Sequence, residues 1–161
     1  MRGLSFYIGN ELFAVDVTLV QKVARKLSIT PVPSSPAEVI GIANLKGRVV
    51  TVLNLSKLLG SAESSFAQQY INTIVFKSDS SAEDQMGIAI EKPGNLIDIE
   101  NDDIRSPPNT AEAEETHYIS GVTEIGNDFF RIIDIEAIRR KYTHSSETGS
   151  ANSLYGGIPN E

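Results

Sequence analysis

The sequence predicts an all-β protein, a barrel or sandwich architecture assembled from two similar small β units. Three observations support this prediction. The apolar residues fall in short runs, turn-forming residues separate the runs, and the pattern of one half recurs in the other half. Many short strands without alternating long helices are typical of barrels and sandwiches.

In the first half of the chain, turn signals separate two predicted hairpins. Gly9-Asn10 supplies the positive φ that a tight turn needs, and prolines at 31 and 33 hold their neighbours in extended conformations. Valines three residues apart in residues 17–23 fit either a short helix or an edge strand. The predicted strands here are residues 3–8, 12–17, 39–45 and 49–55, with residues 27–33 extended.

In the second half, five further runs have strand character, and residues 95–100 alternate cleanly between apolar and polar side chains. Consecutive prolines cannot donate to a ladder, so residues 105–116 are predicted as a loop. The chain after Tyr142 is polar and rich in Ser and Gly, which predicts disorder over 143–161. The predicted strands here are residues 70–77, 86–91, 95–100, 118–125 and 128–135, followed by a terminal helix over 137–142.

An internal repeat links the two halves. Placing Gly41 over Gly121 aligns positions 41–59 with positions 121–139 without a gap and keeps apolar positions together. Asn54 then meets Asp134, and both side chains suit the N-cap of a short helix. A second match lays positions 13–16 over positions 88–91. The repeat predicts two β units, each closed by a hairpin and a short helix.

Composition limits the possible functions. The chain has 161 residues, 40% of them hydrophobic, and a net charge of −7, which argues against nucleic acid as the main partner because phosphate binding needs clustered Lys and Arg. It contains no cysteine, so no disulfide or thiolate metal site is expected, which fits a reducing cytoplasm. The apolar runs are far shorter than the ~20 residues of a membrane helix, and the N-terminus lacks signal-peptide features.

The charges are unevenly distributed. Eleven carboxylates lie between Asp79 and Glu115 against two basic residues, which predicts a solvated acidic face. The basic residues gather in three small groups elsewhere. These groups are Lys22/Arg25/Lys26, Lys46/Arg48 and Arg139/Arg140/Lys141.

Residues with catalytic or metal-binding patterns are scarce. His117 and His144 have no His, Asp or Glu at helical metal spacing. Asp98, Glu100 and Asp102 resemble the start of a calcium loop, but Asp103 stands where the loop needs glycine. The sequence therefore predicts no catalytic residue, no metal site and no cofactor. A carboxylate pair of the kind that glycosidases use is the enzymatic alternative, and no particular pair stands out.

The stretch Lys46-Gly47-Arg48 between two predicted strands is typical of a hairpin turn with charged residues facing water. The glycine spacing from Gly41 to Gly47 is one residue too long for a phosphate-binding loop. The remaining functional hypothesis is recognition, because a rigid turn holds a basic side chain in a fixed place.

Residues 6–141 resemble the CheW family of coupling proteins in bacterial chemotaxis. The most specific stretch is "ITPVPSSPAEVIGIANLKGRVVTVLNLSKLLG", with Pro-x-x-Pro-x-x-x-x-Gly spacing that runs through Asn-Leu-basic-Gly to Gly60. The resemblance implies two packed, five-stranded SH3-like barrels with short helices. The corresponding domain is residues 1–142, divided near 61–69, with strands that can be exchanged between the barrels.

The resemblance also implies a function. Such proteins are cytoplasmic, non-catalytic adaptors, expected to be monomeric alone, which dock on the cytoplasmic tip of chemoreceptors and on the regulatory domain of a CheA-type histidine kinase. Recruitment to membrane receptor arrays needs no insertion into the membrane. The positions that the resemblance assigns to partner binding are Val20, Lys22, Gly41, Asn44, Lys46 and Gly47.

Departures from the family pattern leave two alternatives open. Lys46 stands where relatives usually carry Arg, and Lys22 where many carry an acid, which changes the hydrogen-bonding geometry and the charge that a partner meets. One alternative is therefore a paralogous adaptor of a specialised motility, pilus or second-messenger pathway. The other is a sensor that binds a small ligand between the barrels.

Overall fold

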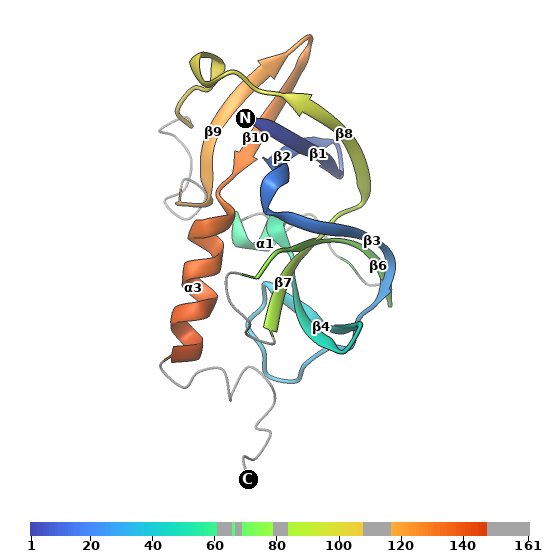
Figure 1. Cartoon of the computed structure of the whole chain (residues 1–161). Helices are drawn as coiled ribbons and strands as arrows, with labels where there is room; N and C mark the ends of the chain where they lie inside the picture. The colour runs from blue at the N-terminus through green and yellow to red at the C-terminus, as the bar shows by residue number, and fades with distance from the viewer. Residues whose placement is uncertain (61–65, 67–68, 79–83, 108–116, 148–161) are drawn as a thin grey trace.

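The computed structural model describes residues 1–60, 66, 69–78, 84–107 and 117–147, and most of these residues lie in β-strands (Figure 1). Short helices lie between some of the strands, and a longer helix follows the last strand. The elements in chain order are β1 (Arg2–Ile8), β2 (Glu11–Asp16), η1 (Val17–Leu19), β3 (Val20–Ser28), β4 (Val39–Leu45), β5 (Arg48–Leu53), α1 (Leu55–Leu58), β6 (Tyr70–Phe76), β7 (Asp84–Ala89), β8 (Lys92–Asp98), η2 (Asn101–Asp103), β9 (Ile119–Ile125), β10 (Asp128–Ile133) and α3 (Ile135–Glu147).

The strands form two five-stranded sheets, in the orders β8-β1-β2-β10-β9 and β3-β6-β7-β5-β4. Each sheet closes on itself, because the segment after one edge strand bonds to the other edge strand. Thr30 and Ile42 exchange two backbone hydrogen bonds of 2.8 Å, and Arg105 and Val122 do the same. We call the first sheet barrel 1 and the second barrel 2. The predicted all-β fold of two five-stranded SH3-like barrels is confirmed.

Each barrel draws strands from both halves of the chain. The hairpin β1–β2 completes the barrel that contains β8, β9 and β10, while β6–β7 completes the barrel of β3, β4 and β5. The two strand orders match position by position, and so do the pairing directions: β2 runs parallel to β10 as β7 runs parallel to β5. Figure 1 shows the chain crossing between the barrels at η1, where β2 ends and β3 begins.

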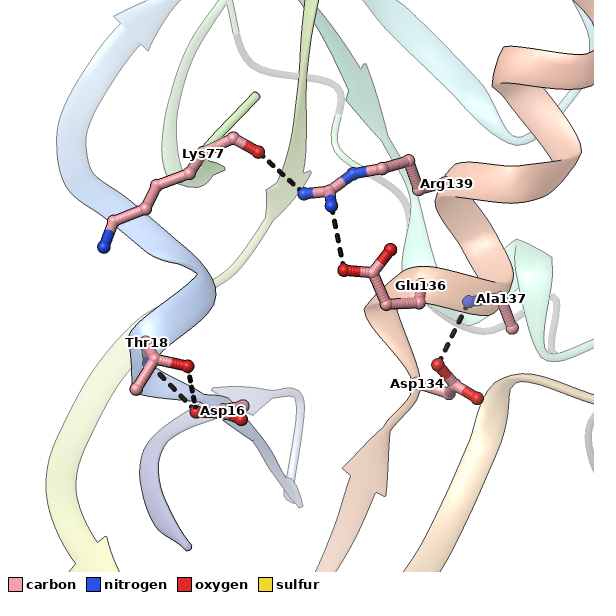
Figure 2. Close-up of polar contacts among 7 residues, drawn as sticks. All are labelled: Asp16, Thr18, Lys77, Asp134, Glu136, Ala137 and Arg139. Atoms are coloured by element: carbon pink, nitrogen blue, oxygen red, sulfur yellow. Dashed lines mark hydrogen bonds and ion pairs between the residues drawn. The ribbon is translucent and has the colours of Figure 1, made fainter. Parts of the chain in front are cut away.

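The repeat that places Gly41 over Gly121 is confirmed in atomic detail. The Asn54 side chain accepts a hydrogen bond from the Lys57 N–H, and the Asp134 side chain accepts one from the Ala137 N–H (Figure 2). Both residues therefore act as the predicted N-caps. Their own N–H groups donate to the carbonyls of Glu38 and Tyr118, which are equivalent positions in the same alignment.

The second match, of positions 13–16 with positions 88–91, is wrong in register. Phe130 lies opposite Leu12 in barrel 1, whereas its counterpart Val50 lies opposite Gln85 in barrel 2. The structure therefore makes Leu12 equivalent to Gln85, while the sequence match made it equivalent to Gly87, two positions farther along. A shift of two leaves every side chain on the same face of its strand, which is why the apolar pattern still matched.

The core consists of three apolar layers. One fills the inside of barrel 1 and includes Ala14 and Phe130, and another fills barrel 2 and includes Val50 and Val75. The largest layer lies between the barrels and draws on strands of both sheets and on both α-helices. Its most deeply buried large side chains are Phe6, Phe13, Leu53, Leu55, Ile74, Phe76, Ile88, Ile90, Ile135 and Ile138.

Two element boundaries differ from the sequence prediction. Residues 17–23, which fitted either a helix or an edge strand, contain both: η1 turns the chain and β3 follows at the sheet edge. The terminal helix runs from Ile135 to Glu147, so it begins before the predicted range 137–142 and extends through residues 143–147, which were wrongly predicted to belong to the disordered tail. The Asp134 cap starts the helix earlier, and no Gly or Pro interrupts it before Gly149.

Two other expectations fall largely or wholly outside the described residues: the domain division near 61–69 and the tail from residue 148 onward. Within the described residues, no helix combines the length and the apolar character needed to cross a lipid bilayer.

Helix α3 follows barrel 1 but is anchored on barrel 2. The Tyr142 hydroxyl donates a 2.8 Å hydrogen bond to the Glu38 carboxylate just before β4, and Lys141 lies 3.5 Å from the same oxygen. Partial burial raises the pKa of Glu38, but the Tyr142 bond, a backbone bond and the Lys141 charge outweigh it and hold the pKa below its usual range. Burial, with the bond to Glu38, raises the pKa of Tyr142. Figure 1 shows α3 running along barrel 2.

We predict that Gly41→Ala destabilises the protein by about 2–3 kcal/mol. A Cβ at Gly41 would lie 2.3 Å from the Thr30 carbonyl oxygen, at the bridge that closes barrel 2. Thermal unfolding should give a Tm lower by about 5–10 °C. Gly126→Ala is the control, because that site is open and has only a positive φ of 63°, which costs about 1–2 kcal/mol. An equal or larger effect at Gly126 would contradict the close-approach explanation.

We predict that Tyr142→Phe lowers the free energy of unfolding at pH 7 by up to about 1 kcal/mol. Because the pKa of Glu38 is lowered in the folded state, its contribution is present above the unfolded pKa and disappears as the pH falls through the folded pKa. The pKa of Tyr142 is raised in the folded state. Its contribution to stability is therefore fully present below the unfolded pKa of about 10 and is lost as the pH rises above that value toward the folded pKa.

The free energies of unfolding of wild type and Tyr142→Phe, measured by urea denaturation, should therefore differ most at pH 7. The difference should be smaller at pH 3.5 and at pH 10.5. Tyr70→Phe, at a tyrosine that is 56% exposed, is the matched control and should leave stability unchanged at all three pH values. A difference between wild type and Tyr142→Phe that is the same at every pH would contradict this role of Glu38.

Candidate partner-binding site

The turn between β4 and β5 is a two-residue hairpin turn. Leu45 pairs with Arg48, and the two residues between them, Lys46 and Gly47, have φ angles of 53° and 84°. Positive φ at both central residues defines a type I′ turn, whose twist matches that of the flanking strands. The Gly47 N–H donates a 2.9 Å hydrogen bond to the Asn44 side chain. This Lys46 turn (residues 44–48) confirms the predicted hairpin turn.

Lys46 occupies a backbone position that suits glycine better. The left-handed region costs a residue with a Cβ about 1–2 kcal/mol. In barrel 1 the equivalent turn lies between Ile125 and Asp128, and the position that matches Lys46 is Gly126, with φ 63°. Lys46 and Gly47 are both exposed. The turn therefore presents a lysine side chain at a fixed place in solvent, at some cost in backbone energy.

Gly41 and Asn44 have structural roles in and beside the hairpin that carries the Lys46 turn. Gly41 is buried, and the Thr30 backbone crosses it so closely that no side chain fits. Asn44 is exposed, and its side chain bonds to the turn rather than pointing freely into solvent. Asn44 therefore holds the turn directly, whereas Gly41 permits the close approach of Thr30 that closes barrel 2.

Val20 lies where the chain passes from barrel 1 to barrel 2. It follows η1, whose start is held by the Asp16 carboxylate, which accepts hydrogen bonds of 3.0 and 2.8 Å from the Thr18 N–H and hydroxyl (Figure 2). Val20 pairs with Phe76 and is half-buried against the layer between the barrels. It therefore leaves part of an apolar side chain accessible beside the junction of the two barrels.

Lys22 lies two residues farther along β3, opposite Val75, and is exposed. β3 and β4 stand at the two ends of the strand order of barrel 2, and the Thr30–Ile42 bridge makes them neighbours. Barrel closure thus brings the two predicted groups, Val20 and Lys22 on β3 and the residues of the Lys46 turn, onto one barrel.

Arg139 is a structural residue at the same junction that the sequence prediction did not identify. It donates a 2.7 Å hydrogen bond to the Lys77 carbonyl at the end of β6 and forms a 2.9 Å ion pair with Glu136 (Figure 2). Lys77 in turn donates its N–H to the Leu19 carbonyl, next to Val20. Arg139 therefore ties α3 to the strand end beside Val20. The sequence feature that could have pointed to Arg139 is its place in the basic triplet Arg139/Arg140/Lys141 on the predicted terminal helix.

Chemical groups for catalysis do not gather at this junction. The described part of the chain has no group of three or more His, Cys, Asp or Glu side chains placed to hold a metal ion. His117 is exposed, and its ring contacts the Tyr118 ring edge-on at a centroid distance of 5.8 Å. The region thus combines a lysine on a backbone turn, a half-buried valine and a braced junction between the barrels.

Comparisons with known proteins agree with this geometry. A family model for the CheW-like domain matches residues 2–142. The chemotaxis protein CheW of Treponema pallidum is 26% identical over 137 residues, covering 84% of this chain and 79% of that protein. The chemotaxis protein CheW of Thermotoga maritima is 43% identical over 72 residues, covering 45% of this chain and 46% of that protein.

A solved structure has the same fold. The crystal structure of the scaffolding protein TtCheW from Thermoanaerobacter tengcongensis matches with a TM-score of 0.69 at 23% identity, covering 82% of this chain and 87% of that chain. The family model spans all the described strands. The chain therefore belongs to the CheW-like family, a family of non-catalytic scaffold proteins of bacterial chemotaxis.

Proposed function

We propose that this protein couples chemoreceptors to a CheA-type histidine kinase, as a cytoplasmic adaptor recruited to membrane receptor arrays. The Lys46 turn supports this proposal most directly. A lysine is held in a left-handed conformation where the equivalent turn of barrel 1 uses glycine. Backbone strain of this kind suggests a functional side chain, because glycine would form the same turn without the strain.

The proposed receptor contact combines charge and apolar surface. Lys46 orients the partner through a charge carried on a rigid backbone turn, while Val20 offers apolar contact beside the barrel junction. Lys22 adds a second charge on β3, and Gly47 and Asn44 hold the turn. Gly41 acts indirectly, because it permits the closure that places β4 beside β3.

The braced junction between the barrels supports a scaffold role in particular. An adaptor must hold two partners in a fixed relative position, and such a protein needs little internal movement. The layer of buried apolar side chains, the η1 crossing and the Arg139–Lys77 bond all join the two barrels. A kinase regulatory domain and a receptor that bind different parts of this body would thus keep a constant geometry.

We predict that Lys46→Glu and Lys46→Gly both weaken binding to a chemoreceptor cytoplasmic fragment by about tenfold, which corresponds to about 1.4 kcal/mol. Lys46→Gly should keep or slightly raise Tm, because glycine adopts the left-handed conformation freely. Lys46→Arg should bind at least as well as wild type if the partner offers a carboxylate, since the guanidinium fork can pair with both of its oxygens.

Binding is measured by isothermal titration calorimetry and folding by thermal melts. Lys92→Glu is the control, because Lys92 is an exposed strand lysine on β8, the barrel 1 counterpart of β3. Unchanged receptor binding by Lys46→Glu and Lys46→Gly would rule out the contact role of Lys46. A wild-type protein that binds neither the receptor fragment nor the kinase regulatory domain would overturn the proposed function itself.

A further inference from the structure

Barrel closure joins two groups of basic residues that are separate in the sequence. β3 carries Lys22, Arg25 and Lys26, and the Lys46 turn carries Lys46 and Arg48. All five residues are exposed. We call them the basic face. Their strands are neighbours only because the Thr30–Ile42 bridge closes barrel 2.

The closing bridge lies between the two groups in the sequence and brings together the two edge strands that lead to them. Lys26 lies four residues before Thr30, and Lys46 lies four residues after Ile42, on antiparallel segments. The pairing of β3 with β6 shifts register between Ala24 and Leu27, so Lys26 lies at a β-bulge, where the regular alternation of strand faces is interrupted. Both lysines also have left-handed backbones, with φ of 52° and 53°.

The basic face has no acidic partner among the described residues, which sets it apart from other basic side chains. In the part of the chain that the structure describes, none of the five side chains takes part in an ion pair or side-chain hydrogen bond. Several basic residues elsewhere are paired, such as Arg2 with Asp98 and Arg131 with Glu11. Positive charges gathered on neighbouring strands repel one another and create a local positive potential. This potential attracts anions.

The strands of the two barrels differ in charge, although the chain as a whole is acidic. The strands of barrel 2 contain four basic residues and one acidic residue, Asp84. The strands of barrel 1 contain five acidic and three basic residues. A short acidic partner would be drawn to barrel 2 and repelled from barrel 1, and the pair of opposite fields would set its orientation.

From this arrangement we infer that the receptor segment that binds this chain is rich in carboxylates and contacts β3 as well as the Lys46 turn. The inference rests on the proposed function and names the chemistry of its partner. A protein segment fits better than nucleic acid, because β3 and the Lys46 turn contain no aromatic side chain for base stacking and the net charge of −7 repels a long polyanion.

The test measures association rates of the full chain with three probes at 50, 150 and 400 mM NaCl. The probes are a chemoreceptor cytoplasmic fragment encoded in the same genome, a polyglutamate peptide and a single-stranded oligonucleotide. Lys22→Glu and Lys26→Glu should each slow association with the receptor fragment and with polyglutamate about five- to tenfold at 50 mM NaCl, and the effect should shrink at 400 mM as salt screens the charges.

Arg105→Glu is the matched control, because Arg105 is exposed, closes barrel 1 through backbone bonds only, and undergoes the same change of charge. It should stay within about twofold of wild type. If Lys22→Glu and Lys26→Glu bind the receptor fragment as well as Arg105→Glu does, the inference is overturned. The proposed function would still stand in that case. Tighter binding of the oligonucleotide than of polyglutamate would also overturn the inference.

The two proposals fail differently in this experiment. If polyglutamate binds through Lys22 and Lys26 but the receptor fragment does not bind, the basic face keeps its assigned chemistry and the proposed function is wrong. Thermal melts of Lys22→Glu and Lys26→Glu complete the test, because a loss of binding supports the inference only in variants whose Tm matches wild type.

Discussion

The apolar layer between the two barrels holds the whole structure together, because strands of both sheets and helices α1 and α3 pack into it. Its strands are buried on both faces, so their residues alternate between two interiors. Along β6, Ile74 and Phe76 face this layer while Ile71 and Val75 face the inside of barrel 2. Burial of each large side chain contributes about 1.5–3 kcal/mol, and the stacked rings of Phe6 and Phe13, with centroids 5.6 Å apart, lie in the same layer.

Exchange of hairpins makes this layer inseparable from the barrels themselves. Because β1–β2 belongs to the barrel of the second half, neither half of the chain can complete a barrel alone. The crossing at η1 and the anchoring of α3 on barrel 2 are consequences of this arrangement. A body built in this way suits a scaffold, since a partner on one barrel is held in fixed relation to a partner on the other.

Pseudo-symmetry provides an internal comparison that separates architecture from recognition. Asn54 and Asp134 cap equivalent helices, and Gly41 and Gly121 allow equivalent close approaches, so these residues serve the fold in both barrels. Lys46 and Gly126 occupy equivalent turn positions but differ in side chain and charge. Where the barrels agree, the fold explains the residue; where they differ, as at Lys46, the fold alone does not require it.

The strands, the turns and the repeat could be predicted from the sequence, because they depend on local signals. Alternating apolar residues, the positive φ of Gly9 and Gly47, and N-caps such as Asn54 act over a few residues and are visible in one dimension. The alignment of β2 with its counterpart β7 in the other barrel was misjudged by two residues, since a strand pattern of period two looks the same after such a shift. The end of α3 was misjudged because polar residues without a breaker fit helix and coil equally well.

The folded arrangement was needed to establish which hairpin completes which barrel and which distant residues become neighbours. Pairing between strands far apart in the chain depends on how both faces of each strand are buried, and composition does not encode that choice. The six positions assigned to partner binding, from Val20 to Gly47, were identified by resemblance. Their arrangement came from the Thr30–Ile42 bridge, which sets β3 beside β4 and joins two basic groups into one face. Charge is a property of the sequence, whereas a charged surface exists only once the barrel has closed.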